Sequence, residues 1–297
     1  MYKVLLTGAG GFLGKSLKRT IDQDIITLGR HDANIICDLS TDIPKIPQIK
    51  LVIHAAGKAH SVPKSNNEIE QFFSVNVRGT QNLLQGLENQ NTIPQRFVFI
   101  SSVAVYGLES GINIKESQTL SAVDPYGLSK VQAEDLVLKW CQKNDVVVTI
   151  LRLPLVIGKT PPGNLHSMIN GLKKGYYFNI ARGTARRSMV LANDIGHFLI
   201  HVSAVGGIYN LTDGYHPSFY ELSFRISEKL NVGHPRNIPL WLAKCISTVG
   251  DHLGSNFPLN SNKLSKLTSD LTFDDSKARE VGWTSNMVLE QLDFFDK

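Results

Sequence analysis

The chain has only three cysteines in 297 residues and no long hydrophobic run. Cys37, Cys141 and Cys245 lie far apart and lack the Cys/Cys or Cys/His spacing that holds zinc, so we expect neither a disulfide framework nor a metal site. No apolar stretch reaches the roughly 18 residues of a membrane span, and no basic segment followed by an apolar one precedes the first strand pattern. These absences predict a cytoplasmic protein with reduced thiols and without a membrane span.

A large excess of one charge is also missing, because 31 Lys and Arg face 26 Asp and Glu, for a net charge of +5. The basic residues are scattered rather than gathered in one run, which argues against a nucleic-acid partner. A phosphorylated small molecule accounts for the positive charge equally well. Hydrophobic residues make up 42% of the chain, which is enough for a sizeable buried core.

Short apolar runs alternate with helical segments in the first half of the chain. The runs expected to form strands are Val4–Thr7, Ile25–Leu28, Leu51–His54, Phe97–Ser101 and Val146–Leu151. Segments with helical periodicity, including 69–87 and 131–142, lie between most of them. This alternation predicts an α/β fold, a Rossmann-like doubly wound parallel sheet with helices on both faces.

The alternation fades after Gly158, where residues 160–163 read TPPG. We therefore expect a dinucleotide-binding domain over residues 1–158. Residues 159–297 should form a smaller, mixed, mainly substrate-binding portion, which can still return a strand or a helix to the first domain. It is expected to be built partly from segments 164–175, 218–230 and 239–251.

Residues 7–14 read TGAGGFLG and directly follow the first apolar run. Glycines three apart at a strand-to-helix turn let backbone N–H groups and the helix N-terminus approach a pyrophosphate. The segment therefore predicts a dinucleotide-binding turn. The residues expected to form it and to open the next helix are Gly8, Gly11, Phe12, Leu13 and Gly14.

A serine, a tyrosine and a lysine form a candidate catalytic trio. Ser102 follows the strand predicted at 97–101, and Asp124 and Pro125 are typical of a helix start. Tyr126 and Lys130 would share a face of that helix, being four residues apart. An adjacent ammonium and an oxidised nicotinamide both favour the phenolate, so Tyr126 is predicted to transfer the proton. Ser102 would hold the substrate oxygen, while Lys130 would lower the tyrosine pKa and contact the nicotinamide ribose.

Motifs over nearly the whole chain resemble the extended short-chain dehydrogenase/reductase family, and within it the sugar-nucleotide epimerase/dehydratase enzymes. They are TGAGGFLG at 7–14, HAAG at 54–57, NVRGTQNLL at 76–84, ISSVAVYG at 100–107, PYGLSK at 125–130, RLPLVIG at 152–158, RSMVLANDI at 187–195, IYNLTDG at 208–214 and DDSKAREVGW at 274–283.

By position, the resemblance implies further cofactor contacts. Ala55, Ala56 and Gly57 would pass beside the cofactor, and Asn76 would support the active-site helix. Leu153 would lie near the nicotinamide amide, and Asp38 and Leu39 would contact the edge of the adenine. Gly29 stands where NAD-preferring members carry an acid, and Arg30 after it could pair with a 2'-phosphate. NADP(H) is therefore favoured, with NAD(H) as the alternative.

The resemblance also implies substrate contacts and narrows the reaction. Arg187 would contact the substrate diphosphate, and Asn164 would make a substrate-side contact. Val103 and Ala104 replace the Asp and Glu that dehydratases use, so dehydration is disfavoured. Leu155 stands where galactose-type 4-epimerases usually carry asparagine.

The combined motifs most resemble bacterial enzymes that reduce UDP-4-keto-6-deoxy-HexNAc sugars to UDP-QuiNAc or UDP-FucNAc. We therefore expect NADPH-dependent reduction at C4 of a UDP-linked sugar for surface polysaccharide synthesis. Two alternatives stay open: a 4-epimerase with tightly bound NAD, and a dinucleotide-sensing regulator without turnover. A homodimer packed through segments 69–87 and 131–142 is a further expectation.

Overall fold

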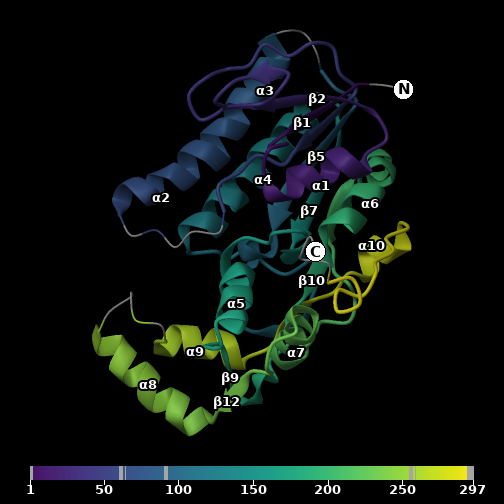
Figure 1. The fold of residues 1–297 in the computed structure, drawn as a ribbon. Helices are drawn as coiled ribbons and strands as arrows, with labels where there is room; N and C mark the ends of the chain where they lie inside the picture. Colours follow the sequence, from purple (N-terminus) through teal and green to yellow (C-terminus); the bar gives the residue numbers. More distant parts are fainter. Residues whose placement is uncertain are drawn as a thin grey trace.

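The computed structural model describes residues 3–59, 63, 65–89, 93–253, 257 and 259–292 (Figure 1). Its centre is a seven-stranded sheet in the order β11-β7-β5-β4-β1-β2-β3, and every neighbouring pair is parallel. The predicted Rossmann-like sheet is thus confirmed. Its strands are β1 (Lys3–Thr7), β2 (Asp24–Gly29), β3 (Ile35–Ile36), β4 (Leu51–His54), β5 (Arg96–Ser102), β7 (Val147–Leu153) and β11 (Gly207–Asn210).

Side chains of the central strands alternate between two buried clusters, one on each face of the sheet. On β1, Val4 and Leu6 pack with α1 and α6, whereas Leu5 packs with α3 and α4. Both faces of the sheet are therefore covered, as a parallel sheet requires. The covering helices are α1 (Phe12–Thr20), α3 (Gly79–Asn89), α4 (Pro125–Lys143) and α6 (Ala192–Val205).

The helical segment predicted at 69–87 is interrupted by a wider turn. It consists of α2 (Asn66–Phe73), the π-helical turn η1 (Ser74–Arg78) and α3. Asn76 lies in this turn and is buried. Such turns within helices are frequent at functional sites, and this one carries a residue of the predicted site.

The C-terminal part builds a smaller lobe and also returns to the large sheet. β11 pairs with β7, and α6 and α10 (Ser276–Glu280) pack on the same face as α1. The remaining strands form three parallel pairs: β8 (Leu155–Ile157) with β10 (Met189–Leu191), β9 (Phe178–Ile180) with β12 (Arg236–Ile238), and β6 (Gly111–Ile114) with β13 (Leu271–Phe273). The lobe's helices are α5 (Gly163–Lys173), α7 (Phe219–Leu230), α8 (Leu240–Leu253) and α9 (Ser261–Thr268).

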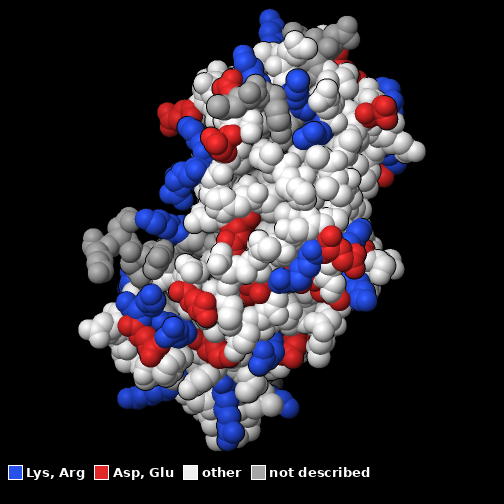
Figure 2. All heavy atoms as spheres, turned by 90° about the vertical axis from the view of Figure 1, so that its right-hand side faces the viewer, with Lys and Arg blue, Asp and Glu red and all other residues white. Residues whose placement is uncertain are grey.

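The surface carries both charges. On the face drawn in Figure 2, Lys and Arg are intermingled with Asp and Glu rather than joined in a basic stripe. None of the helices in the described ranges combines the length and the apolar character that a membrane crossing needs. Within the same ranges, no three or more His, Cys, Asp or Glu side chains gather where they could hold a metal ion. The three cysteines carry free thiols.

Candidate active site

The glycine turn between β1 and α1 is tightly closed on one side and open on the other. Gly8 has φ +72°, and a Cβ added there would lie 2.6 Å from the Ala56 nitrogen. A Cβ at Gly14 would lie 2.0 Å from the Gly8 oxygen, whereas one at Gly10 would meet nothing within 4 Å. Gly11 is the N-cap of α1 and has no side chain to cap the first-turn N–H groups. The turn therefore fits a diphosphate group, which accepts hydrogen bonds from such N–H groups.

The start of α4 is fixed by local chemistry. Asp124 caps the helix by accepting a hydrogen bond from Gly127 N at 3.0 Å, and Pro125 occupies the first turn. A Cβ at Gly127 would lie 2.7 Å from the Ala104 oxygen, so α4 begins in close contact with the turn that follows β5. This contact brings the Tyr126 phenol near Ser102, close enough for the Ser102 hydroxyl to act on the pKa of the phenol. The structure thus brings two members of the trio together.

Lys130 lies one turn further along α4 and is buried. Its Nζ donates to the Ile100 oxygen at 2.9 Å and lies 4.7 Å from the centre of the Phe99 ring. Burial lowers the pKa of Lys130 to about 8, and the neighbouring Glu134 opposes the shift. A Cβ at Gly57 would lie 3.2 Å from this Nζ, so the predicted cofactor-side glycine leaves room for the ammonium.

Burial raises the pKa of Tyr126 above its ordinary value; a hydrogen bond with Ser102 opposes the rise, and Asp124 adds to it. Ser102 is thus one group that favours the phenolate, and the same effect expected of Lys130 stays a prediction. The protein groups together therefore hold Tyr126 as a neutral phenol, the form that donates a proton.

Asn76 supports the trio from the π-helical turn. Its Nδ2 donates to Ser129 Oγ at 2.8 Å and to the Lys58 oxygen at 3.1 Å, and its Oδ1 accepts from Lys58 N at 2.7 Å. Ser129 in turn donates to the Tyr126 carbonyl oxygen at 2.8 Å. These bonds tie the turn, the loop after β4 and α4 together, and the role of Asn76 in the site stays a prediction.

A buried ion pair beneath the trio was not predicted from the sequence. Arg152 on β7 contacts Glu134 on α4 at 2.8 Å, and Ser101 donates to the same carboxylate. Arg152 also donates to the Tyr106 hydroxyl, which donates to Asn210 on β11. One signal was available, because Glu134 follows Lys130 by four residues and so shares its helix face.

A buried histidine was also missed. His54 ends β4, and its ring nitrogens lie 2.7 Å from Thr7 Oγ1 and 3.0 Å from Thr80 Oγ1. Burial lowers the pKa of His54 to about 3, with Lys130 adding to the effect, so the ring is neutral. Thr7 Oγ1 also accepts from Ala56 N at 3.0 Å. The network therefore fixes the loop after β4 against the glycine turn.

The residues predicted to contact the edges of the cofactor differ in their exposure and in their contacts. Arg30 is exposed at the end of β2, and its charge helps to lower the pKa of Asp38. That lowering comes first from hydrogen bonding with Ser40, so the Asp38 carboxylate also holds its own turn. Leu39 and Leu153 are buried, each in one of the two clusters that flank the sheet. Their proposed contacts with a cofactor stay predictions.

The two predicted substrate residues belong to the smaller lobe. Asn164 is exposed on the first turn of α5. Arg187 is half-buried, and its guanidinium donates to the carbonyl oxygens of Lys266 and Ser269 at the end of α9. Burial lowers the pKa of Arg187, against an opposing effect of Asp270. Both substrate roles stay predictions.

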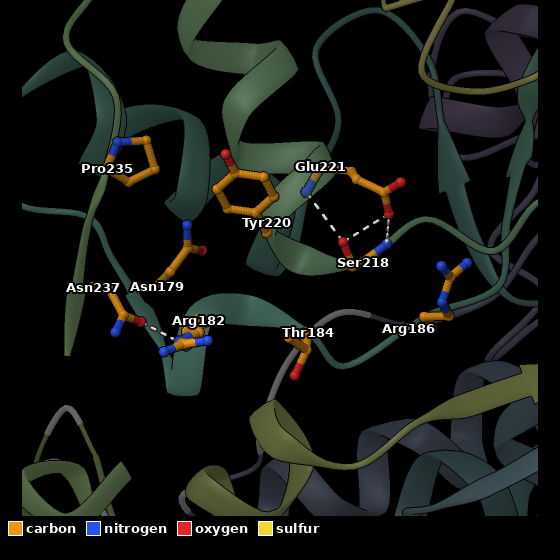
Figure 3. A pocket seen from close by; sticks show the side chains of 9 residues that line it. All are labelled: Asn179, Arg182, Thr184, Arg186, Ser218, Tyr220, Glu221, Pro235 and Asn237. Atoms are coloured by element: carbon orange, nitrogen blue, oxygen red, sulfur yellow. Dashed lines mark hydrogen bonds between the residues drawn. The ribbon is translucent and has the colours of Figure 1, made fainter. Parts of the chain in front are cut away.

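A cavity of about 770 Å³ lies between α7 and the β9–β12 pair (Figure 3). Two arginines, Arg182 and Arg186, line it, and none of the residues predicted for the site does. Large pockets often hold ligands, but this one lacks the trio and the glycine turn. We therefore place the candidate active site at the trio.

Comparisons with known proteins identify the family of the chain. Residues 4–211 match the sequence model of the NAD dependent epimerase/dehydratase family. An Escherichia coli O157:H7 protein named N-acetyl-alpha-D-glucosaminyl-diphospho-ditrans,octacis-undecaprenol 4-epimerase is 26% identical, over 97% of this chain and 92% of its own. A GDP-6-deoxy-D-mannose reductase from Pseudomonas aeruginosa is 32% identical over 46% of this chain and 47% of its own.

Among solved structures, MoeE5 in complex with UDP-glucose and NAD has the same fold, with a TM-score of 0.74. The match covers 98% of this chain and 96% of that chain at 22% identity. The fold is therefore shared over the whole chain, including the smaller lobe.

Proposed function

Because the chain belongs to the NAD dependent epimerase/dehydratase family, we propose that it catalyses hydride transfer at C4 of a diphosphate-linked sugar, with a bound nicotinamide dinucleotide as redox partner. Tyr126 is the proton-transfer group of this reaction. The observation that carries the proposal is the convergence of the trio: the start of α4 packs on the turn after Ser102, and buried Lys130 lies one helical turn beyond Tyr126. A regulator without turnover has no need of this arrangement.

The chain's own residues define the roles. The turn at Gly8, Gly11 and Gly14 would hold the diphosphate of the dinucleotide, which supplies or accepts the hydride when bound. Ser102 positions the sugar oxygen, and Tyr126 gives it a proton on reduction or takes one on oxidation. Lys130 carries a positive charge beside the loop at Gly57, where it would favour the phenolate that takes up the proton on oxidation.

We rank 4-epimerisation first among the reactions of this kind. In it, C4 is oxidised to a ketone, the keto sugar turns over, and the hydride returns to the opposite face. The sequence motifs favour reduction instead. Relatives named as 4-epimerases, however, align with nearly the whole chain, including the substrate-side lobe, whereas the named reductase aligns with about half.

Reduction of a 4-keto sugar is the second candidate, and Arg30 favours it. An exposed arginine at the end of β2, with glycine in place of an acid before it, suits the 2'-phosphate of NADPH. A reductase exchanges its cofactor in every cycle, whereas an epimerase regenerates its own. Cofactor retention therefore distinguishes the two reactions.

Two carriers are candidates for the sugar. One is a nucleoside diphosphate, as in the complex of MoeE5 with UDP-glucose. The other is a polyprenyl diphosphate, as in the name of the Escherichia coli relative, which aligns from end to end. Both carriers present a diphosphate, so the predicted role of Arg187 holds for either.

The test combines cofactor content with product analysis. The purified protein is denatured and its released nucleotide identified; stoichiometric NAD supports the epimerase, and exchangeable NADPH supports the reductase. The protein is then incubated with UDP-GlcNAc, with GlcNAc-diphospho-polyprenol, and with UDP-4-keto-6-deoxy-GlcNAc plus either reduced nicotinamide. NMR identifies the configuration at C4. Absence of a C4 change with all three substrates would overturn the proposal.

A further inference from the structure

Helix α8 concentrates exposed apolar side chains. Sixteen large hydrophobic side chains are exposed in the described ranges, and five of them lie on this one helix. Trp241 is 67% exposed and Leu253 is 63% exposed, which is unusual for residues of this size. The five are Leu240, Trp241, Leu242, Val249 and Leu253.

Four of these side chains form one stripe. At 100° per residue, Trp241, Leu242, Val249 and Leu253 fall within a sector of roughly 120°. The adjoining sector, with Ala243 at its centre, is buried against α9. The helix therefore has two apolar faces, of which the fold uses one.

Helix α8 is attached through its other face, so the stripe points away from the rest of the lobe. A Cβ at Gly250 would lie 2.0 Å from the Leu259 oxygen, so the helix is pressed against the segment before α9. Leu264 and Leu267 of α9 complete the cluster that holds the buried face. In Figure 1, α8 lies at the edge of the smaller lobe, with α9 on its inner side.

The segment that carries the stripe is basic. Residues 236–268 contain four basic residues and one acidic residue, a net charge of +3 from 4 − 1, and one of the four, Lys266, pairs with Glu109 at 3.2 Å. The acid, Asp251, accepts hydrogen bonds from Ser261. The apolar side chains of such a helix can enter the lipid boundary, and basic residues beside them are attracted to anionic headgroups. The stripe and its basic segment therefore match an anionic membrane surface.

The stripe is also connected to the predicted diphosphate contact. Arg187 donates to the carbonyl oxygens of Lys266 and Ser269, at the end of the helix on which α8 packs. A sugar carried on a polyprenyl diphosphate must place its diphosphate in the site while its tail stays in the bilayer. An enzyme for such a substrate therefore needs a surface that seats it on the membrane close to the site.

We infer that the exposed apolar face of α8 is a membrane-docking surface, which seats the enzyme on an anionic bilayer to take a polyprenyl-diphosphate-linked sugar. The inference rests on the proposed function for the identity of the carrier. The docking itself is tested without turnover.

The test uses the full chain and vesicles of equal parts phosphatidylcholine and phosphatidylglycerol. The protein should sediment with these vesicles, less at high salt and less with phosphatidylcholine alone. Trp140 and Trp283 are buried, so Trp241 is the exposed reporter. Its emission should shift to shorter wavelength on binding and be quenched by brominated lipid.

The variant that tests the surface carries Trp241→Ser and Leu253→Ser. Its partition onto vesicles should fall by about tenfold or more, because both side chains lose their apolar contact with the bilayer. Ile112→Ser is the matched control, since Ile112 is 71% exposed on β6 and does not belong to the stripe, and this variant should bind like the parent. Circular dichroism confirms that each variant is folded.

Three results would overturn the inference: no sedimentation of the folded parent, equal binding by the α8 double variant, or a dimer that the double variant dissociates while vesicles bind neither protein. The last would make the stripe an interface between copies.

Turnover of UDP-GlcNAc without vesicle binding would refute docking and leave the proposed reaction standing. Vesicle binding without turnover of the polyprenyl substrate would support docking and refute that carrier.

Discussion

Arg152 on β7 and Glu134 on α4 form an ion pair inside the protein, with 2.8 Å between Nη2 and Oε2 and only 4% and 2% of the side chains exposed. Ser101 donates to the same carboxylate, one residue before Ser102. The pair thus joins the end of the central strand to the helix that carries Tyr126 and Lys130. Because both groups are buried, removal of one would leave the other as an uncompensated buried charge.

We therefore expect Glu134→Leu to lower the free energy of unfolding by about 3–5 kcal/mol, because Arg152 is left charged and buried. The double variant Glu134→Leu, Arg152→Leu should lose less than the single variant, since no unpaired charge remains. Urea unfolding measures both. A loss below about 1 kcal/mol in the single variant would show that the pair is not the constraint described.

Tyr126→Phe should lower kcat by about 10²–10⁴-fold, because the phenol that exchanges the proton is removed. Dinucleotide affinity should change little, since the glycine turn is untouched. Tyr176→Phe is the control, because Tyr176 is 59% exposed outside the trio. Steady-state kinetics and fluorescence titration with the dinucleotide separate the two effects. Retention of most of the turnover by Tyr126→Phe would contradict its assigned role.

Two glycines of the same turn should respond differently to alanine. Gly14→Ala places a methyl group 2.0 Å from the Gly8 oxygen, so the turn must open and the protein should lose about 2 kcal/mol or more of stability. Gly10→Ala has open space and should unfold within about 0.5 kcal/mol of the parent. If the diphosphate approaches through that space, Gly10→Ala should still bind dinucleotide more weakly. Thermal unfolding and calorimetric titration test each part, and parent-like affinity in Gly10→Ala would contradict this approach.

The sequence was sufficient for five of the seven strands of the sheet and for the start of the helix that carries Tyr126 and Lys130. Apolar runs marked the strands because parallel strands are buried on both faces, and Asp124 and Pro125 marked the start of α4 because capping is local chemistry. Partners distant in sequence were not predictable in the same way. Arg152 and Glu134 are 18 residues apart on different elements and meet only once the sheet is assembled.

The smaller lobe shows the same limit. Its apolar helix α8 was expected only as part of a substrate-side segment, since sequence alone does not show which of its two apolar faces is buried. The fold assigns Ala243 to the buried face and Trp241 to the exposed one. The predicted homodimer through 69–87 and 131–142 stays a prediction for the same reason, because both segments also cover the sheet.

Arg30→Glu should shift the relative dinucleotide affinity from NADPH toward NADH. An acid at the end of β2 repels a 2'-phosphate and accepts hydrogen bonds from a free ribose hydroxyl, so the ratio of NADPH to NADH affinity should fall by about tenfold or more. Arg182→Glu, which changes an exposed arginine outside the β2 edge, should leave the ratio unchanged. Titrations with both dinucleotides measure it. An unchanged ratio in Arg30→Glu would remove the argument for NADP(H).

Lys130→Met should change how stability depends on pH. Burial lowers the pKa of Lys130 from its ordinary 10.5 to about 8 in the folded protein. Between these two values the unfolded chain binds more protons at this site than the folded chain, so stability rises with pH there. Below about pH 8, the folded parent instead carries the full penalty of a buried ammonium, about 3 kcal/mol from a shift of roughly 2.5 units.

Methionine does not titrate, so the stability of the parent relative to Lys130→Met should increase from about pH 7 to about pH 10. Other titrating groups are shared by the two proteins and cancel in the difference. Urea unfolding of both proteins across this range measures the change. A difference that stays flat would mean that the Lys130 ammonium is solvated, and its position beside Gly57 and the Ile100 carbonyl would then not exclude water as the structure requires.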